Sequence, residues 1–243
     1  MRRSFFRTIF FLLLINVFCS AGCKKDDVVP LPPDTGSVTD IEGNIYKTVR
    51  IGTQVWMAEN LKVTKFRNGE DIPFVTITQD WADLLLPQRP AYCNSNNNTG
   101  TVAALGRLYN WHAVNDRRGL APAGWHVPSL DEWLVLMNYL GGKQVAGGKM
   151  KDTNSLYWPY QNRDASNSSG FTGRYTQRRE YNGVFRIPNP TFENYTYWWS
   201  STAIELTGPT PKASYAFLNS KGAPAYTNGD SPNLGLAVRC VKD

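Results

Sequence analysis

The sequence predicts an α+β domain with long loops, one well-capped helix near its middle and β-strands towards both ends. A helix start signal followed by an amphipathic stripe covers residues 129–140, and β-prone runs lie at 46–57 and 195–241. Residues 143–195 are rich in Asn, Ser, Gly and Arg and carry only isolated aromatic anchors. A single capped helix between two groups of strands makes an α+β domain with long connections.

The first residues of the chain are typical of a secretory signal. Three arginines precede an apolar run at residues 9–18, which is too short for a membrane span of about 20 helical residues. The small residues 20–22 follow and complete the order of charged, apolar and small-residue regions. We expect residues 1–22 to be removed, which lowers the net charge from +6 to about +3 because the three arginines leave with them.

Cys23 is the predicted lipidation site. The segment CSAGC resembles the processing site of bacterial lipoproteins, in which the cysteine receives the lipid before cleavage. Ser20 departs from the larger aliphatic residue that is usual there, and the alternative is plain secretion with a free Cys23 thiol. Fatty acylation of Cys23 anchors a chain stably, since each buried CH₂ contributes about 0.8 kcal/mol.

Residues 23–36 are expected to be the lipidated cysteine and an extended tether, because they combine charge with several prolines and show no periodicity. Residues 24–27, KKDD, resemble the charged tetrad of surface-exported lipoproteins of the Bacteroidetes type, which favours the external face of the outer membrane. A solvated tether without that meaning is the alternative. The membrane is thus an expected partner, whereas nucleic acid is not, because no dense basic patch with interleaved aromatics occurs.

Residues 37–243 are expected to form one domain, since no internal repeat or second linker divides them. The first β-pair is predicted at 46–51 and 54–57, around a short hairpin turn at Gly52-Thr53. Turn-rich clusters separate a closing meander of strands, which we predict at 195–201, 213–218, 223–227 and 234–241.

The helix has the strongest local signal in the chain. Ser129 followed by Glu132 makes a capping box, in which the Ser hydroxyl and the Glu carboxylate satisfy free N–H groups of the first turn. Gly141-Gly142 supplies the left-handed stop. A second helix is predicted around residues 103–114.

Cys93 and Cys240 are the two cysteines left to the folded part. In an oxidising compartment they can form a disulfide, which on the chain-entropy model contributes roughly 5 kcal/mol. The alternative is two buried free thiols. With His112 and His126 they have the composition of a zinc site, but no closely spaced ligand pairs occur, so we expect none.

Exposed aromatic side chains are the candidates for ligand contact, because Trp and Tyr on loops can stack on sugar rings. The candidates with polar sequence neighbours are Trp158, Tyr160, Tyr181 and Tyr195. Other tryptophans lie in β or amphipathic patterns and are predicted to be core: Trp56, Trp111, Trp125, Trp133 and Trp198.

Several stretches together resemble one family, the Fibrobacter succinogenes major paralogous domain, which is found mostly in lipoproteins and secreted proteins of Bacteroidetes and Fibrobacteres. The stretches are GNIYKTVRIGTQVWMAENL (43–61), ALGRLYNWHAVND (104–116), GLAPAGWHVPSLDEW (119–133), YWWSST (197–202) and GLAVRCVKD (235–243).

The helix motif and the last stretch are also similar, more remotely, to formylglycine-generating, sulfatase-modifying enzymes. That resemblance implies a C-type-lectin-like fold whose first and last strands lie close together. Many family members carry a cysteine where this chain has Ala121, so a disulfide through that position cannot form. Those enzymes use a late pair of reactive cysteines, and only Cys240 lies in the late part here, so no catalytic residue transfers.

No signature of a nucleophile with its base occurs, and no cofactor is expected. The lectin-like resemblance leaves calcium as an alternative at the oxygen-rich residues 94–99, although no acid lies there. The expected function is a lipid-anchored, non-enzymatic cell-surface module that binds an extracellular glycan, polymer or protein through long loops. The alternatives are an enzyme related to the formylglycine generators, or a structural component of an envelope assembly.

Overall fold

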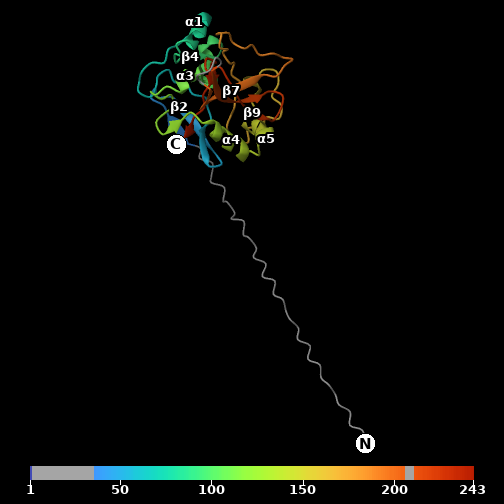
Figure 1. Cartoon of the computed structure of the whole chain (residues 1–243). Coiled ribbons are helices and arrows are strands. Elements are labelled where there is room, and N and C mark those ends of the chain that lie inside the picture. Colours follow the sequence, from blue (N-terminus) through green and yellow to red (C-terminus); the bar gives the residue numbers. More distant parts are fainter. Residues whose placement is uncertain (2–35, 206–210) are drawn as a thin grey trace. The chain divides into compact units, whose positions relative to one another are not determined.

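A computed structural model of the chain describes Met1, residues 36–205 and residues 211–243 (Figure 1). The predicted signal peptide, Cys23 and nearly all of the predicted tether lie outside the described residues. Within the described part, no helix has the length and hydropathy that crossing a membrane requires. All helices and strands belong to the unit Pro32–Asp243.

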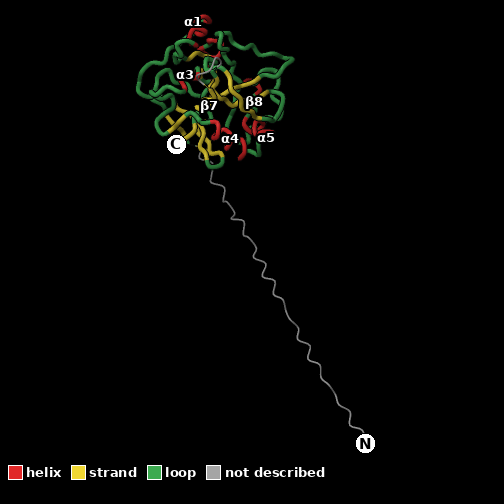
Figure 2. The backbone as a smooth tube through the Cα atoms, in the orientation of Figure 1, coloured by secondary structure: helices red, strands yellow, loops and turns green. Residues whose placement is uncertain are grey.

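The unit has an α+β fold in which helices and strands both occur along the chain (Figure 2). The strands are β1 (Ser37–Thr39), β2 (Ile45–Ile51), β3 (Gln54–Met57), β4 (Tyr92–Asn94), β5 (Arg107–Tyr109), β6 (Trp125–His126), β7 (Tyr195–Glu205), β8 (Lys212–Asn219), β9 (Ala225–Asp230), β10 (Leu236–Ala237) and β11 (Val241–Lys242). The α-helices are α1 (Thr78–Ala82), α2 (Val102–Leu105), α3 (Trp111–Val114), α4 (Leu130–Tyr139) and α5 (Lys143–Met150). Short 3₁₀ turns are η1 (Asp83–Leu85), η2 (Ser95–Asn97), η3 (Thr99–Thr101) and η4 (Ser155–Tyr157).

The first sheet has the strand order β1-β2-β3-β11-β6. The predicted hairpin is confirmed as β2 and β3, and Gly52 in its turn has a φ of 63°, which glycine adopts without a Cβ penalty. Strand β11 pairs with β3 through Val241 opposite Trp56. The last strand of the domain therefore lies in the same sheet as the first three strands, with β2 and β3 between it and β1.

The second sheet has the strand order β4-β5-β10-β7-β8-β9. The predicted meander is correct for β7, β8 and β9, which are antiparallel neighbours. The predicted strand at 234–241 is instead two short strands, because β10 pairs with β7 and β5 in the second sheet while β11 joins the first. The chain changes sheets between them, at Val238–Cys240.

Arg239 fixes this crossing between the sheets. Its side chain is buried, and the guanidinium donates to Oδ1 of Asn60 at 2.8 Å and to the carbonyl oxygens of Met57 and Phe171. Asn60 Oδ1 also accepts from Nε1 of Trp198 at 2.8 Å, and its Nδ2 donates to the carbonyl of Leu105 at 2.8 Å. One buried amide thus links four of the stretches that carry the family resemblance.

The capping box is confirmed at the start of α4. Ser129 Oγ accepts from the backbone N–H of Glu132 at 3.2 Å, and the Glu132 carboxylate accepts from the backbone N–H of Ser129 at 2.8 Å. After the helix, Gly141 and Gly142 have φ values of 100° and 93° and close its last turn. Trp133 of α4 packs against Trp56 and Trp198, so one core reaches both sheets.

The predicted helix at residues 103–114 is wrong. The chain forms α2, then β5, then α3, and Gly106 divides the two helices with a φ of 72°. A Cβ at Gly106 would lie 2.6 Å from Cβ of Asn60 and 2.8 Å from the carbonyl oxygen of Leu61. Close packing against residues 60–61 therefore overrides the helical pattern.

Residues 143–195 are mainly loops, as predicted, but they begin with a helix, α5, that the sequence pattern did not predict. Gly147 and Gly148 weaken its helical signal, and both are required by packing. A Cβ at Gly147 would lie 2.3 Å from the carbonyl oxygen of Pro224, and one at Gly148 2.5 Å from that of Asp164. The loops that follow are held by buried cations.

Lys151 and Arg179 are the clearest of these buried cations, and each donates to backbone carbonyls. Nζ of Lys151 bonds the carbonyl oxygens of Arg163, Asn219 and Gly222. The Arg179 guanidinium bonds the carbonyl oxygens of Gly183 and of residues 75–77. Segments far apart in the sequence are thus fastened together without regular secondary structure.

Candidate binding site

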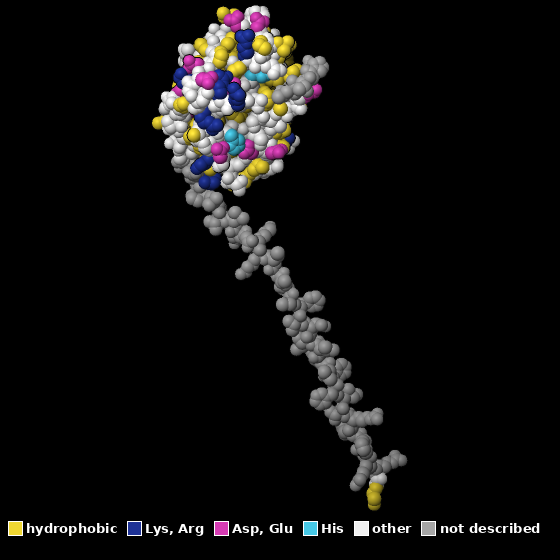
Figure 3. All heavy atoms as spheres, turned by 60° about the vertical axis from the view of Figure 1, so that its left-hand side comes forward, with side chains coloured by type: hydrophobic (Ala, Val, Ile, Leu, Met, Phe, Trp, Pro, Cys, Tyr) yellow, Lys and Arg dark blue, Asp and Glu magenta, His cyan; other side chains and the backbone are white. Residues whose placement is uncertain are grey.

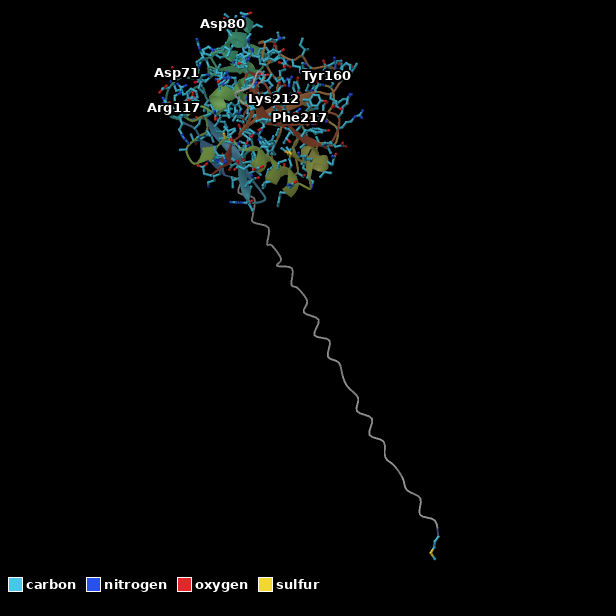
Figure 4. The ribbon with its side chains drawn as sticks, in the orientation of Figure 1. Asp71, Asp80, Arg117, Tyr160, Lys212 and Phe217 are labelled. Atoms are coloured by element: carbon cyan, nitrogen blue, oxygen red, sulfur yellow. The ribbon has the colours of Figure 1, made fainter. Side chains whose placement is uncertain are left out.

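The strands β7, β8 and β9 carry a row of aromatic side chains on one face. Side chains alternate between the two faces of a strand, so Tyr195 and Tyr197 of β7 lie on the same side. Tyr197 lies opposite Phe217 of β8, and Phe217 lies opposite Tyr226 of β9. The ring centroids of Tyr195 and Phe217 are 5.8 Å apart, and those of Phe217 and Tyr226 are 4.9 Å apart (Phe217 is labelled in Figure 4).

A cavity of about 180 Å³ opens beside the Tyr195 end of this row. We call it the aromatic pocket, and its lining includes Tyr175, Arg186, Phe192, Glu193, Tyr195 and Tyr197. Strand β7 supplies the last two side chains, and the loop before β7 supplies the others. Phe192 is 69% exposed and stands at the rim.

Hydrogen bonds between side chains and backbone shape this rim. The Asn194 side chain accepts from the backbone N–H of Asn189 at 2.9 Å and donates to the Asn189 carbonyl at 3.0 Å. Oδ1 of Asn189 in turn accepts from the backbone N–H groups of Thr191 and Phe192. The loop that carries Phe192 and Glu193 is therefore closed on itself.

The hydroxyl groups of the pocket are neutral donors. The Tyr195 hydroxyl donates to Oε2 of Glu193. Burial, reinforced by that hydrogen bond, raises the pKa of Tyr195 above its ordinary value. Burial likewise raises the pKa of Tyr175 to about 12 and raises the pKa of Tyr197. These phenols keep their protons at physiological pH, and the proton of Tyr195 is already donated to Glu193.

The two arginines of the pocket differ in their partners. Arg178 is bonded to both carboxylate oxygens of Glu180, at 2.8 and 2.9 Å, and its guanidinium lies over the Tyr197 ring at 5.1 Å from the centroid. Arg186 is exposed, and its guanidinium has no hydrogen bond or ion pair with any residue that the structure describes. The pocket therefore contains one satisfied cation and one that is available.

The predicted ligand contacts have different outcomes. Tyr195 lines the aromatic pocket, whereas Tyr160 is exposed but does not line it. Tyr181 is 54% exposed, but it does not line this pocket.

Trp158 was predicted wrongly, because it is 2% exposed and belongs to the core. Its Nε1 donates to the carbonyl of Gly173 at 3.0 Å. The polar sequence neighbours of Trp158 gave no sign of this burial. Arg186 and Phe192 line the pocket but were not predicted as ligand contacts. The apolar residues beside prolines in their polar loop, as in IPNPTF, were an available signal.

The predicted disulfide between Cys93 and Cys240 is not formed, and both thiols are free and buried. The two cysteines pack in different hydrophobic clusters, which keeps them apart. Burial raises the pKa of Cys93 to about 12 and also raises the pKa of Cys240. Both are protonated at neutral pH, whereas a reactive cysteine needs a lowered pKa and access to solvent.

His126 is partly buried, and both of its ring nitrogens have hydrogen-bond partners. Its Nδ1 lies 2.7 Å from Oδ1 of Asp243, and its Nε2 lies 2.8 Å from Oε1 of Glu132. Both ring nitrogens are thus engaged by carboxylates. Among the described residues, no group of three or more His, Cys, Asp or Glu side chains could hold a metal ion.

The loop at residues 94–99 uses its amides internally. Oδ1 of Asn94 accepts from Arg107, Oδ1 of Asn98 accepts from the N–H of Gly100, and the Asn97 side chain donates to Thr76. Calcium at this loop was only an alternative to the expected absence of a cofactor, and these contacts do not favour it.

A wider hollow of about 960 Å³ lies around His112 and is polar. Its Arg118 bonds both Asp116 and Glu70, at 2.7 Å each, which neutralises much of its charge. On the face shown in Figure 3, both basic and acidic side chains are present. No Phe, Tyr or Trp side chain lines this hollow, in contrast to the aromatic pocket.

No curated protein and no solved structure matches the chain. The similarity to formylglycine-generating enzymes and the lectin-like assignment therefore stay predictions. The model of one protein family, the Fibrobacter succinogenes major domain, does match, and it covers residues 49–242. That range includes the whole second sheet, the first sheet except β1 and the start of β2, the linking amide of Asn60 and the aromatic pocket, and the chain belongs to this family.

Proposed function

We propose that the chain is a binding module, held at the outer cell surface by lipid on Cys23, that recognises an extracellular glycan, polymer or protein. The aromatic pocket carries this proposal. It combines aromatic walls, a closed rim and an arginine without a described partner, and small-molecule sites are typically apolar hollows with a few placed polar groups. The anchor rests on the sequence pattern at residues 1–27.

Binding without catalysis fits the chemistry of the described residues. The tyrosine hydroxyls of the pocket have raised pKa values and are poor nucleophiles. Both cysteines are buried and protonated, which disfavours a reaction of the formylglycine-generating kind. The pocket instead presents donors, one partly free carboxylate and apolar surface.

Replacement of Phe192 by alanine tests the proposal. Full-length protein, purified in detergent, is applied to panels of extracellular glycans and surface proteins, and the dissociation constant of each captured ligand is measured. We expect Phe192→Ala to weaken binding about tenfold, because removal of an aromatic contact costs roughly 1–2 kcal/mol. Since Phe192 is mostly exposed in the free protein, the fold is unaffected.

Tyr181→Ala is the matched control, because Tyr181 is similarly exposed but lies outside the pocket. Its dissociation constant is expected to equal that of the wild type. If the two variants weaken binding of a ligand equally, or if neither weakens it, that result contradicts binding at the aromatic pocket.

A further inference from the structure

The size of the aromatic pocket limits what enters it. Sites for drug-sized ligands usually measure about 300–1,000 Å³, whereas this cavity is about 180 Å³. It has room for one ring-sized unit of a larger ligand. Its walls include Tyr175, Tyr195 and Tyr197, and an aromatic wall accepts the C–H face of a sugar ring.

The charged groups that remain for a ligand are one donor fork and one acceptor. Arg186 is exposed and without a described partner, and a guanidinium presents five N–H donors in a fixed plane. Glu193 holds the Tyr195 hydroxyl through Oε2, and no described residue bonds its Oε1. Both side chains line the same cavity, and no described ion pair joins them.

The charges that line the pocket balance one another. Arg178 is neutralised by Glu180 and lies 3.9 Å from Asp230. The two remaining charged side chains of the lining are Arg186 and Glu193, one of each sign. A neutral ligand therefore needs no counter-charge here, whereas a carboxylate on the ligand would be repelled by Glu193.

We propose that the pocket binds a neutral sugar ring of a glycan, whose adjacent hydroxyl groups accept from Arg186 and donate to Glu193 while its C–H face packs on the tyrosines. A hydroxyl is both donor and acceptor, so a pair of neighbouring hydroxyls satisfies both groups at once. This inference rests on the proposed function and names the ligand class of the same site.

The test compares neutral glycans with the corresponding uronic-acid glycans by isothermal titration of the full-length protein. The neutral member of each pair is expected to bind at least about tenfold more tightly. Glu193→Gln keeps the shape of the side chain but removes its charge. It is expected to weaken binding of the neutral glycan severalfold and to reduce the difference in affinity between the neutral glycan and the uronic-acid glycan.

Arg186→Gln is expected to weaken the neutral ligand about tenfold, since charged hydrogen bonds contribute about 1.5–3 kcal/mol. Arg117→Gln is the matched control, because Arg117 is also exposed but lines the hollow around His112 instead (Figure 4). Melting temperatures of all variants are measured to confirm that folding is intact.

The outcomes separate this inference from the proposed function. If uronic acids bind better than neutral sugars, or if Phe192→Ala weakens binding while Arg186→Gln does not, the pocket binds ligands but the neutral-sugar chemistry is wrong. If the ligand is a protein and only Phe192→Ala weakens its binding, the pocket again binds ligands but the neutral-sugar chemistry is wrong. If Phe192→Ala changes nothing, the proposed function itself fails.

Discussion

The two histidines of the chain lie in opposite environments. Burial alone would lower the pKa of His126, but its hydrogen bonds with Asp243 and Glu132 outweigh burial and raise it. His112 has burial without compensation: its Nε2 has no partner among the described residues, and its pKa is lowered. One imidazole is stabilised as a cation by the fold, and the other as the neutral form.

These shifts predict opposite pH dependences of stability. A raised folded-state pKa contributes stability below the ordinary histidine pKa of about 6.5, and the contribution is lost as the pH rises through the folded-state value. Replacement of His126 by Gln is therefore expected to lower the free energy of unfolding near pH 6, by about 0.5 kcal/mol for so exposed a pair, and to have little effect near pH 9. Glu132 has a lowered pKa, so its part of the contribution persists until the solution becomes acidic enough to protonate it.

Urea unfolding at the two pH values measures this difference. His112→Gln gives the converse comparison, because a depressed histidine pKa costs stability as the pH falls through it. Wild-type protein is expected to lose stability relative to His112→Gln under acidic conditions. Equal pH profiles for the two variants would show that the carboxylates do not hold a charge on His126.

At the scale of secondary-structure elements, the sequence was informative where the signal was local. The capping box of α4 and the β2–β3 hairpin depend on neighbouring residues, and both were predicted correctly. The break at Gly106 and the helix α5 depend on contacts with residues distant in sequence. Likewise, nothing near Trp158 reveals its bond to Gly173, and nothing near Arg186 shows that it faces tyrosines of β7.

Gly106 allows a direct test of this distinction. Both Gly106 and Gly43 have positive φ, but a Cβ at Gly43 has no neighbour within 4 Å, whereas one at Gly106 would overlap Asn60 and Leu61. An alanine at Gly43 incurs a positive-φ backbone penalty of about 1–2 kcal/mol. Gly106 has a ψ of −159°, in a region that essentially only glycine adopts, so an alanine there incurs about 1–3 kcal/mol. Only Gly106→Ala adds overpacking, typically about 1–3 kcal/mol more.

The measurement is the free energy of unfolding in urea for the two alanine variants. Gly106→Ala is expected to be less stable than Gly43→Ala by that additional amount. Equal losses would mean that residues 60–61 move aside easily, and that the division between α2 and β5 has another cause.

At the scale of the whole molecule, the domain is fastened by buried cations that bind backbone carbonyls. Lys151, Arg179 and Arg239 are each at most 1% exposed, and each joins segments separated by many residues. No carboxylate bonds them among the described residues. The sequence pattern did not indicate that these cations are buried, because a lysine or arginine in a polar stretch is usually on the surface.

Lys151→Met tests how much one such cation contributes. The variant keeps an unbranched side chain but leaves three carbonyl groups without their donor, each of which costs about 1–3 kcal/mol if it stays buried. We expect the free energy of unfolding to fall by at least about 2 kcal/mol. Amide hydrogen exchange should rise locally near Arg163 and in the turn between β8 and β9, which Lys151 joins.

Lys143→Met is the control on the same helix α5, since Lys143 is exposed and, among the described residues, its side chain bonds only the Thr227 hydroxyl. Its stability and exchange pattern should match the wild type. A uniform rise in exchange over the whole domain in Lys151→Met, with no local excess, would show that the lysine supports global stability without fastening these loops.

The choice of acceptor by these cations has a consequence for divergence within the family. Every amino acid supplies a backbone carbonyl, so a tie made to that group does not depend on which side chain the fastened loop carries. Mutations between the ties can therefore accumulate at the rim, around Phe192 for example, while the frame keeps its shape. A fold built in this way can change its ligand specificity while its folded structure stays the same.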